Sequence, residues 1–414
     1  MTASERQRSS SPREGVSVSG FAGGPANFIP GAGFGNGRAL RPSAKSLPEH
    51  ARGHNRSLVL QTLYATGTLS RADLARATGL TRVTISDLVA ELMAEHLIVE
   101  TGQAHDARPG KPATMLDINR AGFQIIGIDL SEYAVFRGAV LDLDGVVLER
   151  VEVPLDDATG NAATEKVVAL AERLVDAASL PLLGIGVGSP GVVDLSGTVL
   201  SAPNLGWPSN GTSGEPLHAA LAAATGLPVI VANDANAAAL AEHSFGGALS
   251  DMMLVKVGHG VGAGLIIGGT ALVGSRFAAG EIGHVVVGTD GGAECACGKV
   301  GCLETWLATP RLDVAIAAAG NDVAERDAIL RRAGERLGIA LAPVVGALDL
   351  AEVVLSGPVE LLDGPLAEAA IQTLRSRTMP SIHGDLVLRM TALGQDIVMR
   401  GAAAMVLSAQ LGVS

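Results

Sequence analysis

Cysteine, aromatic residues and long apolar runs are all scarce in this chain of 414 residues. Its only three cysteines fall within eight positions, and an odd, clustered set argues against a disulfide framework. No apolar run approaches the roughly 18 residues that span a bilayer, and the N-terminus lacks the apolar core of a signal peptide. We therefore expect a soluble, cytoplasmic protein without a membrane partner. The length favours two or three folded units.

The charge is divided unevenly along the chain. Residues 1–120 hold 14 Lys and Arg against 10 Asp and Glu, a net charge of +4, whereas the remainder holds 16 against 32, a net charge of −16. A basic N-terminal segment followed by an acidic remainder indicates that any contact with DNA lies near the N-terminus.

The first 120 residues divide into a tail and a small helical domain. Residues 1–50 are dominated by Gly, Ser, Pro and Ala and are predicted to be disordered. Over 51–118, three short helices are expected; the second begins at Ser70, with an acidic residue three positions later, and ends at Gly79. Two strands around a loop follow, which is typical of a winged helix-turn-helix.

The third helix of this domain has the features of a recognition helix. With its apolar face packed inward, its first turns project polar residues toward a major groove, where Arg can bridge guanine O6 and N7. The loop "RPGKP" adds two cations beside a Gly that permits close approach to DNA. A protein-interaction module is the alternative. The predicted DNA-binding residues are Thr81, Arg82, Thr84, Ser86, Arg108 and Lys111.

From Phe123 the pattern changes to alternating strands and helices. Residues 123–153 predict a meander of three strands, and "DMMLVKVGHGVGAGLIIGG" repeats this strand, Gly-turn, strand pattern later in the chain. Two copies of a strand-rich start followed by helices indicate a two-lobed α/β domain over 119–414, with a cleft between the lobes.

The cysteines form a metal-binding pattern with one histidine. His284, Cys295, Cys297 and Cys302 supply one imidazole and three thiolates within the loop 284–302, a set suited to tetrahedral zinc. Four such ligands without a carboxylate indicate a closed, structural site. The alternative is three buried thiols beside an unrelated histidine.

Several motifs together resemble the ROK family of repressors and sugar kinases. They are "GIDLSEY", "GVGSPGVVD", "APNLGW", "VANDANAAALAE", "GHGVGAGLIIGG" and "GEIGH…CACGKVGCLE". The resemblance implies an α/β two-lobed actin-like sugar-kinase fold, preceded here by the all-α-rich winged helix-turn-helix of the regulator branch. It also implies a sugar site built from Gly191, Asn233, Asp234, Glu281, His284 and Glu304. Asn, carboxylates and a neutral His give the directional hydrogen bonds that discriminate sugar hydroxyls.

The motifs that would hold ATP depart from the family pattern. Where kinases carry Asp-x-Gly-Gly-Thr, this chain reads "DLSEY", with Ser131, Glu132 and Tyr133, and His259 stands where kinases usually carry threonine. Glutamate repels a triphosphate and tyrosine crowds the turn, so Asp234, the general base of the kinases, is expected to be vestigial.

We therefore predict a transcriptional regulator, a repressor of carbohydrate metabolism genes, rather than an enzyme. Its partners would be operator DNA and a sugar or sugar-phosphate effector, and its cofactor zinc. A homodimer or homotetramer is expected, with apolar helices near 322–345 and 391–411 as candidate interfaces. The alternatives are an active kinase of glucokinase type with an added DNA-binding domain, and a zinc-stabilised regulator that responds to a protein partner.

Overall fold

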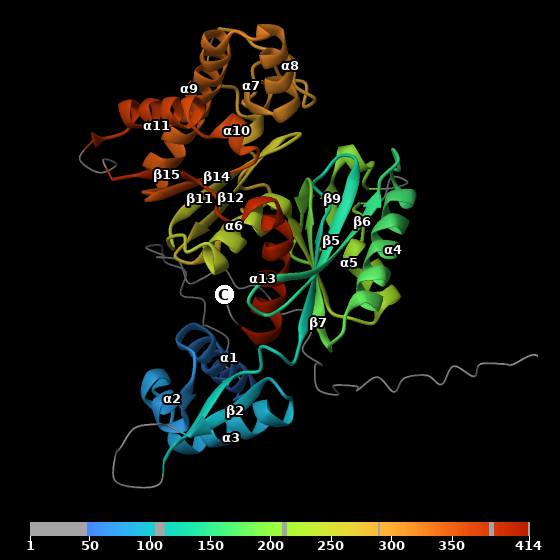
Figure 1. The fold of residues 1–414 in the computed structure, drawn as a ribbon, viewed down its shortest axis with the longest axis vertical. Coiled ribbons are helices and arrows are strands. Elements are labelled where there is room, and N and C mark those ends of the chain that lie inside the picture. The colour runs from blue at the N-terminus through green and yellow to red at the C-terminus, as the bar shows by residue number, and fades with distance from the viewer. Residues whose placement is uncertain (1–47, 104–111, 209–212, 289, 381–384, 413–414) are drawn as a thin grey trace, which may run out of the picture.

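The structure, a computed structural model, describes residues 48–103, 112–208, 213–288, 290–380 and 385–412. Figure 1 shows a small domain, drawn in blue, beside two larger α/β lobes. The predicted tail lies, up to residue 47, outside the described part of the chain. None of the helices described is both long and apolar enough to cross a membrane.

The small domain is a helix-turn-helix with a three-stranded sheet in the order β1-β3-β2. The capping signals in the sequence are confirmed: Ser70 and Asp73 form a capping box at the second helix, and Gly79 ends that helix with left-handed backbone. The elements are α1 (Pro48–Thr66), β1 (Leu69–Ser70), α2 (Arg71–Thr78), α3 (Arg82–Ala94), β2 (Ile98–Gln103) and β3 (Thr114–Ile118). The wing between β2 and β3 includes residues 104–111, which are not described.

The first lobe contains a five-stranded sheet in the order β10-β7-β4-β5-β6. The predicted meander is present as three antiparallel strands, and two later strands add in parallel beside the first of them. The elements are β4 (Gln124–Asp129), β5 (Val135–Leu141), β6 (Val147–Pro154), α4 (Asn161–Ala177), β7 (Leu182–Ser189), β8 (Val192–Val193), β9 (Val199–Ser201), η1 (Pro203–Leu205), α5 (Leu217–Thr225) and β10 (Val229–Asn233).

The second lobe repeats this topology, with the order β13-β12-β11-β14-β15. Again three antiparallel strands are followed by two parallel ones, so the repeat read from the sequence is confirmed. The elements are β11 (Met252–Val257), β12 (Val261–Ile267), β13 (Thr270–Ala271), η3 (Ile282–His284), α7 (Glu304–Leu307), α8 (Thr309–Ala319), α9 (Val323–Leu348), β14 (Glu352–Ser356), α10 (Val359–Leu362), α11 (Pro365–Arg377), β15 (Val387–Met390) and η4 (Gly394–Asp396).

Two helices lie between the sheets and connect the parts of the molecule. α6 (Asp234–Phe245) packs on β12, and α13 (Ile397–Leu411) packs on α6, β4 and β7 (Figure 1). α13 is buried along most of its length. The suggestion that residues 391–411 supply an interface between subunits is therefore wrong for α13, because its apolar side chains are already used within the chain.

Candidate functional site: a Cys3His cluster beside polar residues of both lobes

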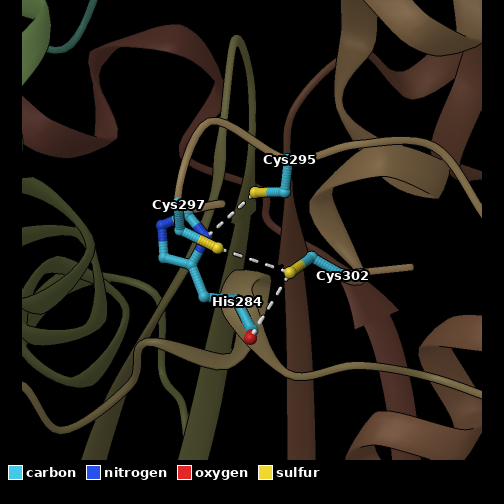
Figure 2. Close-up of side chains that lie close together, drawn as sticks. All are labelled: His284, Cys295, Cys297 and Cys302. Atoms are coloured by element: carbon cyan, nitrogen blue, oxygen red, sulfur yellow. Dashed lines mark hydrogen bonds between the residues drawn. The ribbon is translucent and has the colours of Figure 1, made fainter. Parts of the chain in front are cut away.

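The four predicted metal ligands lie together in the second lobe. One ligand atom from each of His284, Cys295, Cys297 and Cys302 lies within 4.8 Å of the others (Figure 2). The distance from His284 Nδ1 to Cys295 Sγ is 3.4 Å, and that between the Sγ atoms of Cys297 and Cys302 is 3.6 Å. Zinc bonds of about 2.0 Å to nitrogen and 2.3 Å to sulfur place the corners of a tetrahedron about 3.5–3.8 Å apart. The cluster therefore fits a tetrahedral metal ion.

The thiols of the cluster differ in acidity. A hydrogen bond from the backbone of Lys299 lowers the pKa of Cys297 to about 7, whereas burial raises the pKa of Cys302 to about 12. A bound cation favours the thiolate at all three positions. Without such a cation, burial favours the protonated form of Cys302.

Close backbone packing fixes the short 3-10 helix η3, which carries the histidine. A Cβ atom on Gly283 would lie 2.0 Å from the carbonyl oxygen of Val261 in β12, so only glycine fits there. The other end of the loop is tied back by a hydrogen bond of 3.0 Å from Val287 N to Gly301 O. His284 thus presents Nδ1 to the sulfurs, which leaves Nε2 for another partner.

The residues predicted to bind sugar come from both lobes. Asn233 caps α6: its side-chain oxygen accepts from the N–H groups of Ala235 and Asn236, and its amide nitrogen donates to Gly191 O at 2.8 Å. Asn233 therefore keeps one amide N–H for a ligand and otherwise holds the start of α6 in place. Asp234, the next residue, stands in the first turn of that helix.

The carboxylates of this region lie within electrostatic reach of one another. The pKa of Glu281 is raised, because surrounding protein desolvates the carboxylate; the charge of His284 opposes this effect, and those of Asp234 and Glu304 add to it. Glu304 Oε2 accepts from Val261 N at 3.2 Å, and its Oε1 lies 3.8 Å from Cys295 Sγ. The structure therefore brings Asp234, Glu281, His284 and Glu304 together beside the metal cluster.

The two degenerate phosphate loops contact each other. The rings of Tyr133 and His259 are stacked, with centroids 5.0 Å apart and an angle of 15° between their planes. Beside them Lys256, which the sequence analysis did not single out, places Nζ 3.1 Å from Asp234 Oδ2 and 3.0 Å from Ser131 Oγ. A lysine inside a strand gives no signal in the local sequence that it will contact residues of the other lobe.

The predicted recognition helix, α3, presents fewer unused polar groups than its sequence indicates. The hydroxyls of Thr81 and Thr84 bond to each other at the N-cap, and Ser86 Oγ donates to the carbonyl of Arg82. Arg82 is exposed, and no ion pair of its side chain is found in the described part of the chain. Val83, which the sequence analysis missed, is 70% exposed beside it. Arg108 and Lys111 lie outside the described residues.

Comparison with known proteins agrees with this arrangement of lobes and cluster. Residues 125–409 match the model of the ROK family. The chain belongs to the ROK family.

Similarity between this ROK protein and its relatives extends beyond the two lobes. It is 30% identical to the xylose repressor of Caldicellulosiruptor bescii, over 86% of this chain and 96% of that protein. It is 31% identical to a glucokinase of Halalkalibacterium halodurans, over 66% of this chain and 91% of that enzyme. Among solved structures, a ROK family transcriptional regulator described as a homologue of the E. coli MLC protein matches with a TM-score of 0.76 and 27% identity, covering 88% of this chain and 98% of that one. These matches confirm the fold predicted from the sequence.

Proposed function

We propose that this ROK protein is a DNA-binding transcriptional repressor of carbohydrate genes, which leaves its operator when a sugar binds in the cleft. The observation that carries the proposal is a continuous packed connection between the sugar residues and the helix-turn-helix. The match to a protein named xylose repressor supports it, because 86% of this chain is more than the two lobes alone account for.

The connection begins where α6 starts, at Asn233 and Asp234. α13 packs against α6 so closely that a Cβ atom on Gly401 would lie 1.8 Å from the carbonyl oxygen of Ala237. On another side, a Cβ atom on Gly186 of β7 would lie 2.0 Å from Ala402 O of α13. Because the backbones of α6 and α13 are in direct contact, no side chains between them can rearrange to accommodate a shift of α6. Such a shift must therefore move α13.

The same helix reaches the DNA-binding domain at its other end. Leu407 and Leu411 of α13 share one hydrophobic cluster with Val59 and Leu63 of α1. A separate polar contact joins α1 to the first lobe, since Tyr64 donates from its hydroxyl to Leu143 O, between β5 and β6, at 2.7 Å. Movement of α13 is therefore transmitted to the body that carries the recognition helix.

α1 in turn holds α3. The Nη1 atom of Arg56 donates to Glu95 Oε1 at 2.7 Å, beside the end of α3. In a symmetric oligomer, a small rotation of each such domain changes the spacing of two recognition helices and spoils their match to two half-sites. For release to follow, the sugar must bind the rotated state more tightly than the DNA-bound state.

Zinc would have a structural role in this scheme. Held by His284 and the three cysteines, it would fix the histidine tautomer and keep Glu304 beside the cleft. Zinc supplies no reaction step here, because four protein ligands leave no open coordination position.

The charge of the cleft favours a neutral sugar. Four carboxyl groups, those of Asp129, Asp234, Glu281 and Glu304, interact electrostatically in this region, and the one lysine that acts on them, Lys256, is already paired with Asp234. A phosphate group would be repelled by this set, whereas neutral hydroxyls can donate to carboxylates.

The second candidate function is a sugar kinase, favoured by the glucokinase match and by the retention of Asp234. The test is to select genomic DNA fragments with the purified protein at fixed salt and to assay ADP release with the same sugars. Enrichment of specific fragments without sugar-dependent ADP release supports the repressor. Sugar-dependent turnover that Asp234→Asn abolishes, without specific DNA binding, overturns it.

A further inference from the structure

Lys256 joins the two lobes through its side chain. It stands on β11 of the second lobe, and its Nζ reaches Asp234 Oδ2 at 3.1 Å and Ser131 Oγ at 3.0 Å. The side chains of Lys256 and Asp234 are only 18% and 15% exposed. A lysine this far from water is retained only where partners compensate its charge.

Asp129 completes the group. It is the last residue of β4, is 3% exposed, and accepts from Ser131 N through Oδ1 at 2.9 Å. Burial disfavours the charge of Lys256, but the attraction of Asp234 and then of Asp129 outweighs it, so the pKa of the ammonium is raised. Burial raises the pKa of Asp129 in turn, and the charge of Lys256 opposes this effect. Lys256 is therefore held as an ammonium group that pairs directly with Asp234 and attracts Asp129.

Phosphoryl transfer needs a different cation at such a place. Mg²⁺ is held in kinase sites by one or two carboxylates together with the substrate phosphates, and it neutralises the charge that develops on them. Here Asp234 already pairs with an ammonium group, which also attracts Asp129, and a divalent ion placed beside these two residues would be repelled by it. The residues present do not fit a catalytic metal.

The two turns that carry Tyr133 and His259 also lack the arrangement expected for phosphoryl transfer. Tyr133, four residues after Asp129, stacks on His259, three residues after Lys256. The turns whose backbone N–H groups would cradle phosphates are thus held against each other by their side chains.

We propose that Lys256 is a specificity-determining residue: a built-in cation, paired with Asp234 near Asp129, that takes the place of a divalent metal and restricts the site to binding without phosphoryl transfer. The inference deepens the proposed function, and it is tested without DNA or sugar, so the two can fail separately.

The experiment is a titration of the zinc-loaded, full-length protein with Mn²⁺, followed by electron paramagnetic resonance of the free ion at mildly alkaline pH. The wild-type protein is expected to bind no Mn²⁺ at the cleft. Lys256→Ala is expected to gain one site per chain, and the double variant Lys256→Ala with Asp129→Asn to lose it again. Lys256→Arg, which keeps the charge, is the matched control and is expected to gain nothing.

Two results overturn the proposal. One is a Mn²⁺ site in the wild-type protein that Asp129→Asn removes, and this measurement does not require a Lys256 variant that folds. The other is a folded Lys256→Ala protein, verified by its melting curve, that gains no site.

Discussion

Glu304 and Cys295 lie side by side, with 3.8 Å between the carboxylate Oε1 and the sulfur. The pair joins the Cys3His cluster to β12, because Glu304 also accepts a hydrogen bond from Val261 N. A residue proposed to bind sugar is thus placed by residues proposed to bind zinc.

Removal of the metal should therefore weaken sugar binding. We expect Cys302→Ser to lose zinc and to lower sugar affinity by more than about tenfold, because His284 and Glu304 are no longer fixed. Metal content by mass spectrometry and sugar affinity by calorimetry check this. Chelation followed by zinc addition to the wild-type protein is the control, and unchanged sugar affinity in the metal-free protein would contradict the expectation.

Sugar binding should weaken on acidification. Burial and neighbouring charges raise the pKa of Glu281, so its carboxylate takes up a proton at a pH above that of an ordinary glutamate. Affinity that depends on the ionised acceptor is present above this raised pKa and is lost as the pH falls through it. Calorimetry across pH on wild type and Glu281→Gln tests this. An equally steep loss in the glutamine variant would assign the effect to Asp234, His284 or Glu304 instead.

The cleft should prefer a free sugar to its phosphate ester. The carboxylates around Asp234 and Glu281 repel a phosphate, and Lys256 is already paired with Asp234. Parallel calorimetric titrations with a bound sugar and its phosphate measure the preference. Tighter binding of the phosphate ester would contradict a net repulsion by the carboxylates around Asp234 and Glu281.

The recognition helix should depend on Arg82 and Val83. Arg82→Ala is expected to cost about 1–3 kcal/mol of specific binding if the guanidinium reads a guanine. Val83→Ala should make binding insensitive to replacing thymine by uracil in the operator, since the methyl group of thymine is the natural partner of an exposed apolar side chain. Fluorescence anisotropy at fixed salt measures both. Arg332→Ala, on α9 and 54% exposed, is the control that should change nothing.

Backbone packing of α13 can be tested with two glycines. Gly401→Ala is expected to destabilise the protein by about 1–3 kcal/mol, because its Cβ would meet Ala237 O, and to weaken the effect of sugar on DNA binding. Gly346→Ala in α9 meets nothing within 4 Å and should be neutral or stabilising. Denaturant melts measure the free energy of unfolding of both variants. Equal stability of the two would contradict a tight backbone contact between Gly401 and Ala237.

Local signals in the sequence predicted what is local in the structure. Ser70, Asp73 and Gly79 act within one helix, so their capping roles could be read directly. The cysteines lie within one loop, which is why their spacing predicted the cluster that the structure forms.

Relationships over long sequence separations could not be read in the same way. Tyr133 and His259 each departed from a kinase motif, but their stacking depends on the placement of two lobes. Lys256 occupies one position in an apolar strand, and only the fold brings it to Asp129 and Ser131. Val83 was missed because an apolar residue in a helix predicts core, whereas here it is exposed.

The most direct test is an anisotropy titration of the protein bound to its selected operator with the sugar that it binds, at fixed salt. Coupling through α13 predicts that the sugar weakens DNA binding by at least about fivefold, and that DNA weakens sugar binding by the same factor. A sugar that binds in the cleft and leaves the affinity for DNA unchanged would contradict the proposed repressor mechanism.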